Sequence, residues 1–381
     1  MSISSKESNE VLKLAKVVLW LMLIIGSILI LKFFGNLLKP LVVAIIFWYI
    51  IRIVSGGLKS IKYKGSFLLP TWVTKLIAFV IIMAVLFLFI DIIVINLKQI
   101  VDRADHYNTR QDNLLHSIAE FMGIDDISEE IKNLPSSTEL RPFLTQLVNS
   151  LSSGIGYTFI ILIYLIFILI EDFIFQKKIV NIYKNARHFE EMKIVIDQMN
   201  NSIKRYLSVK TFASFLTALL AFTALKIIGV DFPLLWAFIV FTFNFIPYVG
   251  SFFATLLPAM FAALQFNSFS YFFYVFASVQ MAQIVVANFI EPRIVGKSLN
   301  LSPLVVFVTL TIWGTIWGVL GMIIAVPVTS ILVIVLAQFP STRYVAVLLS
   351  ETGDIDKMIV PSHHLSTRED FEAKKAASDS V

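Results

Sequence analysis

The sequence contains no cysteine and only five histidines among its 381 residues. Without cysteine the chain can form no disulfide, and it offers neither a thiol nucleophile nor a thiolate metal ligand. Gly-x-Ser-x-Gly, His-Glu-x-x-His and Walker motifs are absent as well. These absences argue against redox, zinc and hydrolase chemistry and against ATP binding by this chain. We therefore expect no catalytic residue, no metal site and no cofactor.

Charged residues are also scarce, at 15% of the chain, whereas hydrophobic residues make up 57% and the mean hydropathy is +0.83. Soluble domains contain roughly 45–50% apolar residues. A membrane span needs about 20 consecutive apolar residues, and four early runs reach or approach that length: residues 17–34, 37–54, 76–97 and 155–170. The pattern predicts an all-α polytopic membrane protein with about eight membrane segments.

The connections between these runs differ in charge. Residues 52–75 contain five basic residues and no acidic one, residues 98–141 contain nine acidic and five basic residues, and residues 177–210 are again rich in lysine and arginine. Because basic loops stay in the cytoplasm, the first and third segments are predicted to be inside and the second outside. Both termini are then cytoplasmic. The net charge of +5 needs no nucleic acid partner, since inner loops and anionic lipid headgroups account for it.

The acidic connection is too long for a simple turn. Its apolar residues recur near helical spacing, and Ser136 with Glu139 forms a capping box, so a small helical extramembrane domain is predicted. A metal site can be imagined from Asp102, Asp105, His106 and His116, but a solvated acidic helix face explains these residues better.

An amphipathic helix is predicted on the inner side, where apolar residues from Phe189 to Ile203 fall on one helical face. It either lies in the cytoplasmic membrane interface or forms a lid packed against protein. The tail from Ser350 is polar, and we expect it to be disordered.

Two proline- and glycine-interrupted units follow in the C-terminal half. Each unit opens with Pro-Leu at 233 or 303, folds at a glycine, has a proline in its second arm and closes with Gln-Phe. Arms of about 15 residues are short for full crossings, and prolines free carbonyls from the helix ladder. Re-entrant or broken hairpins are therefore predicted, and such paired segments point to a transporter's binding site. Ordinary kinked helices packed by small residues are the alternative.

Polar residues lie near these interruptions. We expect substrate-binding or gating roles for ten of them: Asn244, Pro247, Gly250, Gln280, Gln283, Asn288, Glu291, Arg293, Gly321 and Pro327. Gln280 and Gln283 share a helix face, from which Asn288 is displaced. Hydrogen bonds between helices would explain the amides equally well, and Glu291 and Arg293 could instead anchor a turn. Asp91, flanked by apolar residues, is the candidate for binding a proton or cation.

Three ordered motifs resemble the autoinducer-2 exporter family, its exporter subgroup in particular: Asn-Phe-Ile-Pro-Tyr-Val-Gly at 244–250, Glu-Pro-Arg-Ile-Val-Gly at 291–296 and Leu-Ser-Pro-Leu-Val-Val-Phe at 301–307. The resemblance covers nearly the whole chain. One departure is Ser302, because many members carry a histidine before this proline. That departure weakens any proton-coupling scheme that rests on a histidine there.

The resemblance implies a bacterial inner-membrane transporter whose named substrate is the quorum-sensing signal autoinducer-2, although some relatives are assigned to sodium or lithium export against protons. The cargo would thus be a small polar solute or a monovalent cation, moved by a protein in the lipid bilayer that we expect to be a homo-oligomer. A non-transport scaffold or signalling protein is a minor alternative. The expected layout is N-terminal spans at 1–97, a periplasmic domain at 98–150, the fourth span and amphipathic helix at 151–210, a transport core at 211–340 and a partly disordered cytoplasmic tail at 341–381.

Overall fold

The computed structural model describes residues 5–60, 62–63, 66–67, 70–102, 155–182, 186–295, 300–355 and 358–359. Within them the fold is helical, apart from a two-stranded antiparallel pair, β1 (Lys62–Tyr63) and β2 (Ser66–Phe67), in which Lys62 faces Phe67. The expected periplasmic domain lies almost entirely outside the described residues, as does the chain beyond residue 359.

Six helical segments in the described residues are long and apolar enough to cross a membrane: Gly35–Lys59, Trp72–Asp102, Met192–Ile228, Val249–Phe266, Phe269–Ile294 and Val319–Gln338. Three shorter apolar helices accompany them, at Leu21–Phe33, Pro233–Phe243 and Pro303–Trp317. Many large apolar side chains on these helices are exposed, Phe87 and Leu304 among them, as expected for residues that face lipid. The chain is a multi-pass membrane protein, as its composition predicts.

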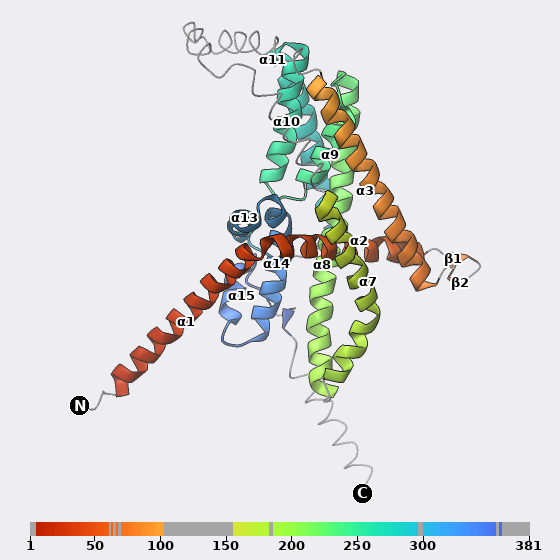
Figure 1. The fold of residues 1–381 in the computed structure, drawn as a ribbon. Helices are drawn as coiled ribbons and strands as arrows, with labels where there is room; N and C mark the ends of the chain where they lie inside the picture. Colours follow the sequence, from red (N-terminus) through yellow and green to blue (C-terminus); the bar gives the residue numbers. More distant parts are fainter. Residues whose placement is uncertain are drawn as a thin grey trace, which may run out of the picture.

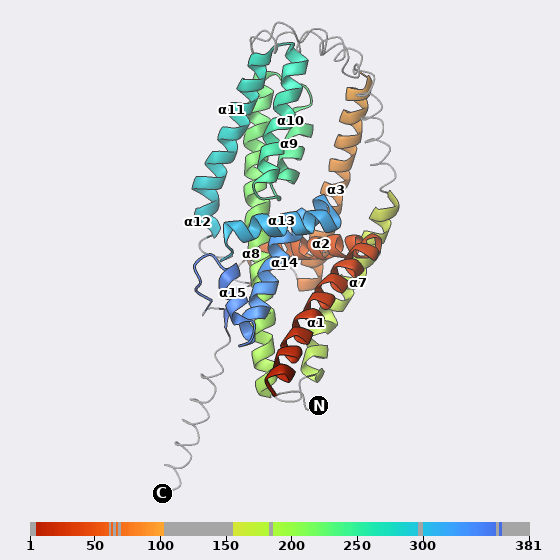
Figure 2. The ribbon, with the colours of Figure 1, turned by 90° about the vertical axis from the view of Figure 1, so that its left-hand side faces the viewer.

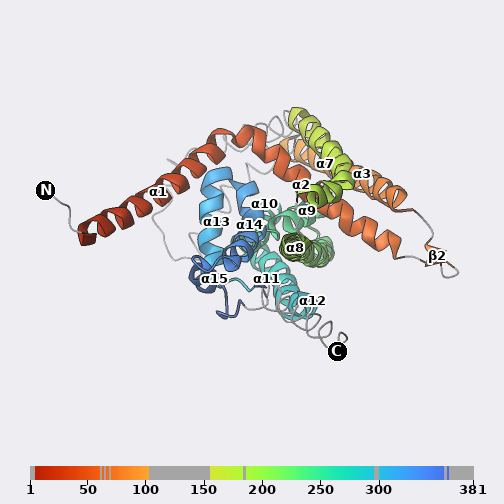
Figure 3. The same cartoon turned by 90° about the horizontal axis from the view of Figure 1, so that it is seen from below.

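The N-terminal helices form a group of their own. The first helix, α1 (Ser5–Phe33), extends away from the rest of the molecule toward the N-terminus (Figures 1 and 3). The next, α2 (Gly35–Lys59), packs with α3 (Thr71–Asp102) and α7 (Ile155–Ile182) around a small apolar core made by Ala44, Ile51, Ala78, Ile82 and Leu165.

Two polar contacts hold this group together. Lys75 Nζ on α3 lies 2.5 Å from Asp172 Oδ2 on α7, and Ser55 Oγ donates to Thr74 Oγ1 at 2.9 Å between α2 and α3. The contacts join the beginning of α3 to both of its neighbours.

The long helix α8 (Ala186–Ile228) runs through most of the height of the molecule (Figure 2). Its 43 residues correspond to about 65 Å. The helix continues without a break through residue 210, where the sequence changes from polar to apolar. The amphipathic stretch is therefore the first half of α8 and not a separate interfacial helix. The later part of this stretch packs on protein, since Ile203 joins a cluster with Tyr49 and Val333, and Asn200 Oδ1 accepts a hydrogen bond from Tyr49 Oη at 2.8 Å. Met192, earlier on the apolar face, is exposed.

The two interrupted units are hairpins whose first arm is the shorter one. In the first, α9 (Pro233–Phe243) has 11 residues and α10 (Val249–Phe266) has 18; in the second, α13 (Pro303–Trp317) has 15 and α14 (Val319–Gln338) has 20. The sequence predicts arms of about 15 residues, and the observed arms lie on either side of that length. Pro258 and Pro327 lie inside the longer arms, as the sequence predicts.

Each hairpin is closed by a glycine that touches the backbone of its first arm. A Cβ placed on Gly250 would lie 1.8 Å from the carbonyl oxygen of Phe243, and one on Gly321 would lie 1.9 Å from the carbonyl oxygen of Trp313. No side chain fits at either position without moving the backbone. The weak sequence repeat thus corresponds to a repeated way of folding the hairpin.

The hairpins take different places around α8. The first stands beside the C-terminal half of α8 together with α11 (Phe269–Val285), whereas α14 runs along the N-terminal half of α8 and α13 packs on α14 (Figures 1 and 2). A short π-helix, η2 (Val286–Ile290), and α12 (Glu291–Val295) continue α11. The tip of the first hairpin rests on the second, because buried Ile246 packs against Leu310 and Ala325.

The C-terminal segment is ordered further than its polar composition suggested. After α15 (Arg343–Leu349), residues 350–355 attach to the beginning of the second hairpin. Asn300 Nδ2 donates to the carbonyl of Asp354 at 2.6 Å, and the Ser302 amide donates to the carbonyl of Leu349 at 3.1 Å. The expected disorder from Ser350 onward is therefore wrong as far as residue 355.

Candidate functional site

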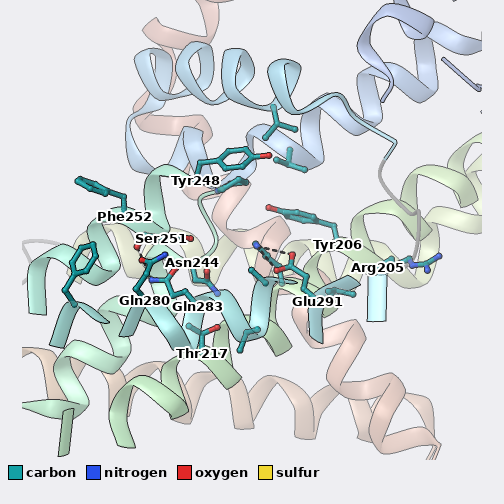
Figure 4. A pocket seen from close by; sticks show the side chains of 18 residues that line it. Arg205, Tyr206, Thr217, Asn244, Tyr248, Ser251, Phe252, Gln280, Gln283 and Glu291 are labelled. Atoms are coloured by element: carbon teal, nitrogen blue, oxygen red, sulfur yellow. Dashed lines mark hydrogen bonds and ion pairs between the residues drawn. The ribbon is translucent and has the colours of Figure 1, made fainter. Parts of the chain in front are cut away.

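A cavity of about 860 Å³ lies where the tip of the first hairpin meets α8, the α11–α12 segment and the second hairpin (Figure 4). The hairpin tip contributes Asn244, Pro247 and Tyr248, and α10 continues the wall with Ser251 and Phe252. The remaining lining residues come from three other regions: Arg205, Tyr206, Val209, Lys210 and Thr217 from α8; Phe276, Gln280, Gln283, Val286, Ala287 and Glu291 from the α11–α12 segment; and Val306 and Val326 from α13 and α14.

Amide groups gather on one wall of the cavity (Figure 4). Gln283 Nε2 donates to Thr255 Oγ1 at 2.9 Å and to the carbonyl oxygen of Ser251 at 3.0 Å, and Thr255 Oγ1 lies 3.2 Å from Gln280 Oε1. Asn244 is 8% exposed and its side chain makes no hydrogen bond within the part of the chain that the structure describes. The wall therefore combines two glutamines that are both hydrogen-bonded to Thr255 with an amide that is available to a ligand.

An ion pair occupies the opposite part of the cavity (Figure 4). Lys210 Nζ on α8 lies 3.1 and 3.4 Å from the two carboxylate oxygens of Glu291, at the start of α12. The side chains are 13% and 25% exposed, so the pair is largely withdrawn from water. The π-helical turn η2 directly precedes Glu291, and such turns are frequent at functional sites.

Two tyrosines lie between the amides and the second hairpin. Tyr206 on α8 is 7% exposed, and its hydroxyl donates to the carbonyl oxygen of Phe245 at 3.4 Å, whereas Tyr248 is 58% exposed. Their hydroxyl groups point toward the same gap below α13 (Figure 4). The contact to Phe245 holds the hairpin tip against α8.

The backbone at Tyr248 is strained. Its φ of 59° and ψ of −64°, with a hydrogen bond of 2.6 Å from the Val249 amide to the Pro247 carbonyl, describe a γ-turn with positive φ. This turn is rare for residues other than glycine. Strain of this kind persists only where the surroundings enforce it, and it concentrates at ligand clamps and switches.

The structure brings together five of the ten predicted substrate or gating residues: Asn244, Pro247, Gln280, Gln283 and Glu291. Gly250 and Gly321 shape the hairpins from within, and Pro327 lies inside α14 next to the cavity residue Val326. Asn288 and Arg293 are exposed and do not line the cavity. Asp91 is exposed on α3, also outside the cavity, so its role as a proton or cation site stays a prediction.

Sequence reasoning missed Lys210, Tyr206 and Thr255. Lys210 looked like one more basic residue of a cytoplasmic segment, yet it is the last charge before the apolar run of α8. Its spacing of four from Tyr206 and seven from Thr217 places all three on one helix face, and that spacing was the available signal. Thr255 lies in a largely apolar stretch after Gly250, and nothing in the sequence indicates that its hydroxyl contacts Gln280 and Gln283.

The sequence profile of the AI-2E family of transporters matches residues 18–341. The chain is 35% identical over 238 residues to the AI-2 transport protein TqsA of Escherichia coli K12, a match that covers 62% of this chain and 67% of that protein. It is 32% identical over 209 residues to a putative transport protein of Borreliella burgdorferi, covering 55% of this chain and only 58% of that relative's length.

The chain is also 27% identical over 332 residues to the putative transport protein YhhT of Escherichia coli K12. This longer match covers 86% of this chain and 88% of the relative. The family profile therefore extends over the N-terminal spans, the long helix and both hairpins. This chain belongs to the AI-2E family of transporters.

Proposed function

We propose that the chain is a secondary transporter of the bacterial inner membrane that exports a small polar solute through the cavity at the tip of the first hairpin. The observation that carries this proposal is the chemistry of the lining, in which three neutral amides face one ion pair whose charges cancel. A solute with hydroxyl groups both donates and accepts hydrogen bonds, so it matches amides, which offer both kinds of group.

Autoinducer-2 is the first candidate for this solute. It is a small hydroxylated molecule, and the relative that is 35% identical to this chain is named an AI-2 transport protein. The mixed donors and acceptors of Asn244, Gln280 and Gln283 suit such a molecule better than a bare sodium ion, since a hard cation prefers a shell of oxygen ligands and is repelled by amide N–H groups.

Antiport of sodium or lithium against protons is the second candidate. It is favoured by the carboxylate of Glu291, which lies in the cavity and is paired with Lys210. A cation or a proton could compete with the lysine for this carboxylate, and breaking the pair would then be part of the transport cycle.

The hairpins are the proposed moving parts. The first hairpin contacts the second through Ile246 and contacts α8 through the carbonyl of Phe245, so a shift of its tip would change access to the cavity. Interrupted membrane segments lining a cavity are the usual construction of transporter sites. Export as the direction, cytoplasmic termini and a homo-oligomeric state remain parts of this proposal that follow from the family resemblance and the loop charges.

Flux measurements in proteoliposomes test the proposal. The full-length protein is reconstituted, a proton gradient is imposed, and transport of autoinducer-2 and of sodium is measured in parallel. Autoinducer-2 flux above that of protein-free vesicles supports the first candidate, and sodium flux coupled to protons supports the second. The absence of both fluxes, with the protein shown to be folded and inserted, would refute transport of either class.

A further inference from the structure

We propose that Gln283 determines specificity, in that its side-chain oxygen accepts a hydrogen bond from a hydroxyl or N–H group of the transported solute. The proposal rests on the transport function proposed above and goes beyond it by assigning one atom of the cavity to one kind of solute group. A solute that carries only hydrogen-bond acceptors could not bind to this oxygen, so the proposal predicts that such solutes are not transported.

The orientation of the Gln283 amide is fixed by its neighbours. Its nitrogen lies 3.0 Å from the carbonyl oxygen of Ser251 and 2.9 Å from the hydroxyl oxygen of Thr255. A main-chain carbonyl can only accept hydrogen bonds, so the flipped amide would place two acceptors against each other. The nitrogen must therefore face α10, and the oxygen is directed away from these two partners.

That oxygen is left without a donor. Gln283 is only 5% exposed, and its Oε1 is buried with no hydrogen-bond partner within the described part of the chain. A buried acceptor without a donor costs free energy in the folded protein. Side chains that only hold a fold together rarely bear this cost, whereas binding sites do so because the ligand supplies the missing partner.

Gln265, near the end of α10, provides the contrast. Its Oε1 accepts from the Asp231 amide at 2.6 Å, and its Nε2 donates to the Gly229 carbonyl at 2.9 Å. Both ends of this amide are thus used in the fold, and Gln265 does not line the cavity. Gln265 is therefore satisfied at both ends by the fold, whereas Gln283 is satisfied at its nitrogen alone.

The groups around Gln283 complete a hydroxyl-binding site. Asn244 and Gln280 line the same wall and present further amide groups (Figure 4). The Gln283 oxygen is screened from water in this conformation, so the side chains that cover it must move before a solute reaches it. A hydroxyl that donates to Gln283 can then accept from the amide nitrogen of Asn244 or Gln280. The site consequently favours solutes with several hydroxyl groups.

Replacement of Gln283 by methionine tests the proposal, because methionine has a similar volume and no amide. In proteoliposomes with the full-length protein, Gln283→Met should raise the KM for autoinducer-2 by about tenfold or more, the effect of losing one buried hydrogen bond to the solute. The melting temperature of the purified variant should not fall, because Thr255 Oγ1 still donates to the Ser251 carbonyl at 3.1 Å, so both partners of the lost amide keep a hydrogen bond, and an unpaired buried acceptor disappears. The combination of weaker binding with unchanged or higher stability is the diagnostic result.

Gln265→Met is the matched control, with the opposite pattern. It breaks two hydrogen bonds that hold the loop before α9, so its melting temperature should fall while the KM remains that of the wild type. Gln283→Glu is the second variant, measured at a pH at which its carboxyl is protonated, because the O–H can then donate to the Ser251 carbonyl while the other oxygen keeps the acceptor position. Its KM should lie between those of the wild type and Gln283→Met even if the methionine variant folds poorly.

Three outcomes would overturn the proposal. If Gln283→Met lowers the melting temperature and leaves the KM unchanged, Gln283 is structural, its oxygen satisfied by a resident water. If the variant loses sodium flux but keeps autoinducer-2 flux, the oxygen is a cation ligand. A KM for Gln283→Glu no better than that for Gln283→Met would refute an acceptor role. In all three cases the wild type still transports, which separates these failures from a failure of the proposed function.

Discussion

Glu291 pairs with Lys210, 81 positions earlier in the chain, and not with Arg293, two positions later. The pair links α8 to the start of α12 across the cavity, and Arg293 lies exposed outside the cavity. The choice of partner changes the expected results of mutating this motif, because the two charges of Glu-Pro-Arg act in different places.

We predict that Lys210→Met and Glu291→Gln each lower stability by about 1–3 kcal/mol, since each leaves a partly buried charge without its partner. The double variant should recover part of that loss, with a coupling energy of about 1 kcal/mol or more. Thermal unfolding of the three variants measures the cycle. Arg293→Met is the control and should change stability by less than about 0.5 kcal/mol; an effect as large as that of Glu291→Gln would contradict the pairing.

The hairpin glycines give a second prediction. Gly250→Ala and Gly321→Ala should each destabilise the protein by about 2 kcal/mol or more, because the new methyl group would overlap a backbone carbonyl of the other arm. Unfolding midpoints test this. Gly56→Ala on α2 is the control, since no atom lies within 4 Å of its Cβ position, and it should be neutral or stabilising by about 0.5–1 kcal/mol. Equal midpoints for all three variants would rule out the close approach.

The close approach of Gly250 and Gly321 to backbone carbonyls also makes these positions unsuitable for testing whether the hairpins act as a gate. A leucine at Gly250 or Gly321 would disturb folding and flux together, so loss of transport in such a variant would not identify a gate. Residues whose side chains reach the cavity without holding the turn, such as Asn244 and Gln280, separate the two effects better.

Local signals in the sequence were sufficient to predict a helical multi-pass membrane protein, its two interrupted hairpins and several cavity residues. Proline and glycine mark the hairpins because they disrupt the helix ladder wherever they occur. Asn244, Gln280 and Gln283 are conspicuous because amides are costly among apolar residues. Each of these inferences depends on neighbours in the chain and not on the tertiary fold.

The partner of Glu291 and the continuity of α8 could not be predicted in the same way. The Lys210–Glu291 pair depends on how α8 packs against α11, which no sequence spacing encodes. For α8, the change from a polar to an apolar stretch near residue 210 was read as a boundary. Residues 186–228 contain neither proline nor glycine, so the absence of helix breakers was a better guide than the change in composition.

Topology is a third prediction. The C-terminal end of α3 and the junction of α7 with α8 lie at opposite ends of the molecule (Figures 1 and 2), and the segments beyond them differ in charge as described above. In this cysteine-free chain, Asn108→Cys should react with an impermeant maleimide in intact cells, whereas Lys184→Cys should react only after permeabilisation. Labelling of both cysteines to the same extent in intact cells would be incompatible with this orientation.

The fourth prediction concerns the strained turn at Tyr248. Glycine adopts positive φ at no steric cost, whereas alanine retains the strain of the tyrosine backbone. Tyr248→Gly should therefore be more stable than Tyr248→Ala by about 1 kcal/mol, the reverse of the usual order of these residues. Because both variants lack the ring, the difference between their melting temperatures reports the backbone strain at residue 248 alone.

The same pair of variants also tests whether the strain serves transport. If the turn is a switch, relieving the strain in Tyr248→Gly should favour the conformation described here and slow autoinducer-2 flux below that of Tyr248→Ala. Tyr248→Phe keeps the ring and the strain, so it should transport at close to the wild-type rate unless the hydroxyl contacts the solute. A glycine variant that is less stable than the alanine variant would show that the γ-turn is not the conformation of the hairpin tip in the folded protein.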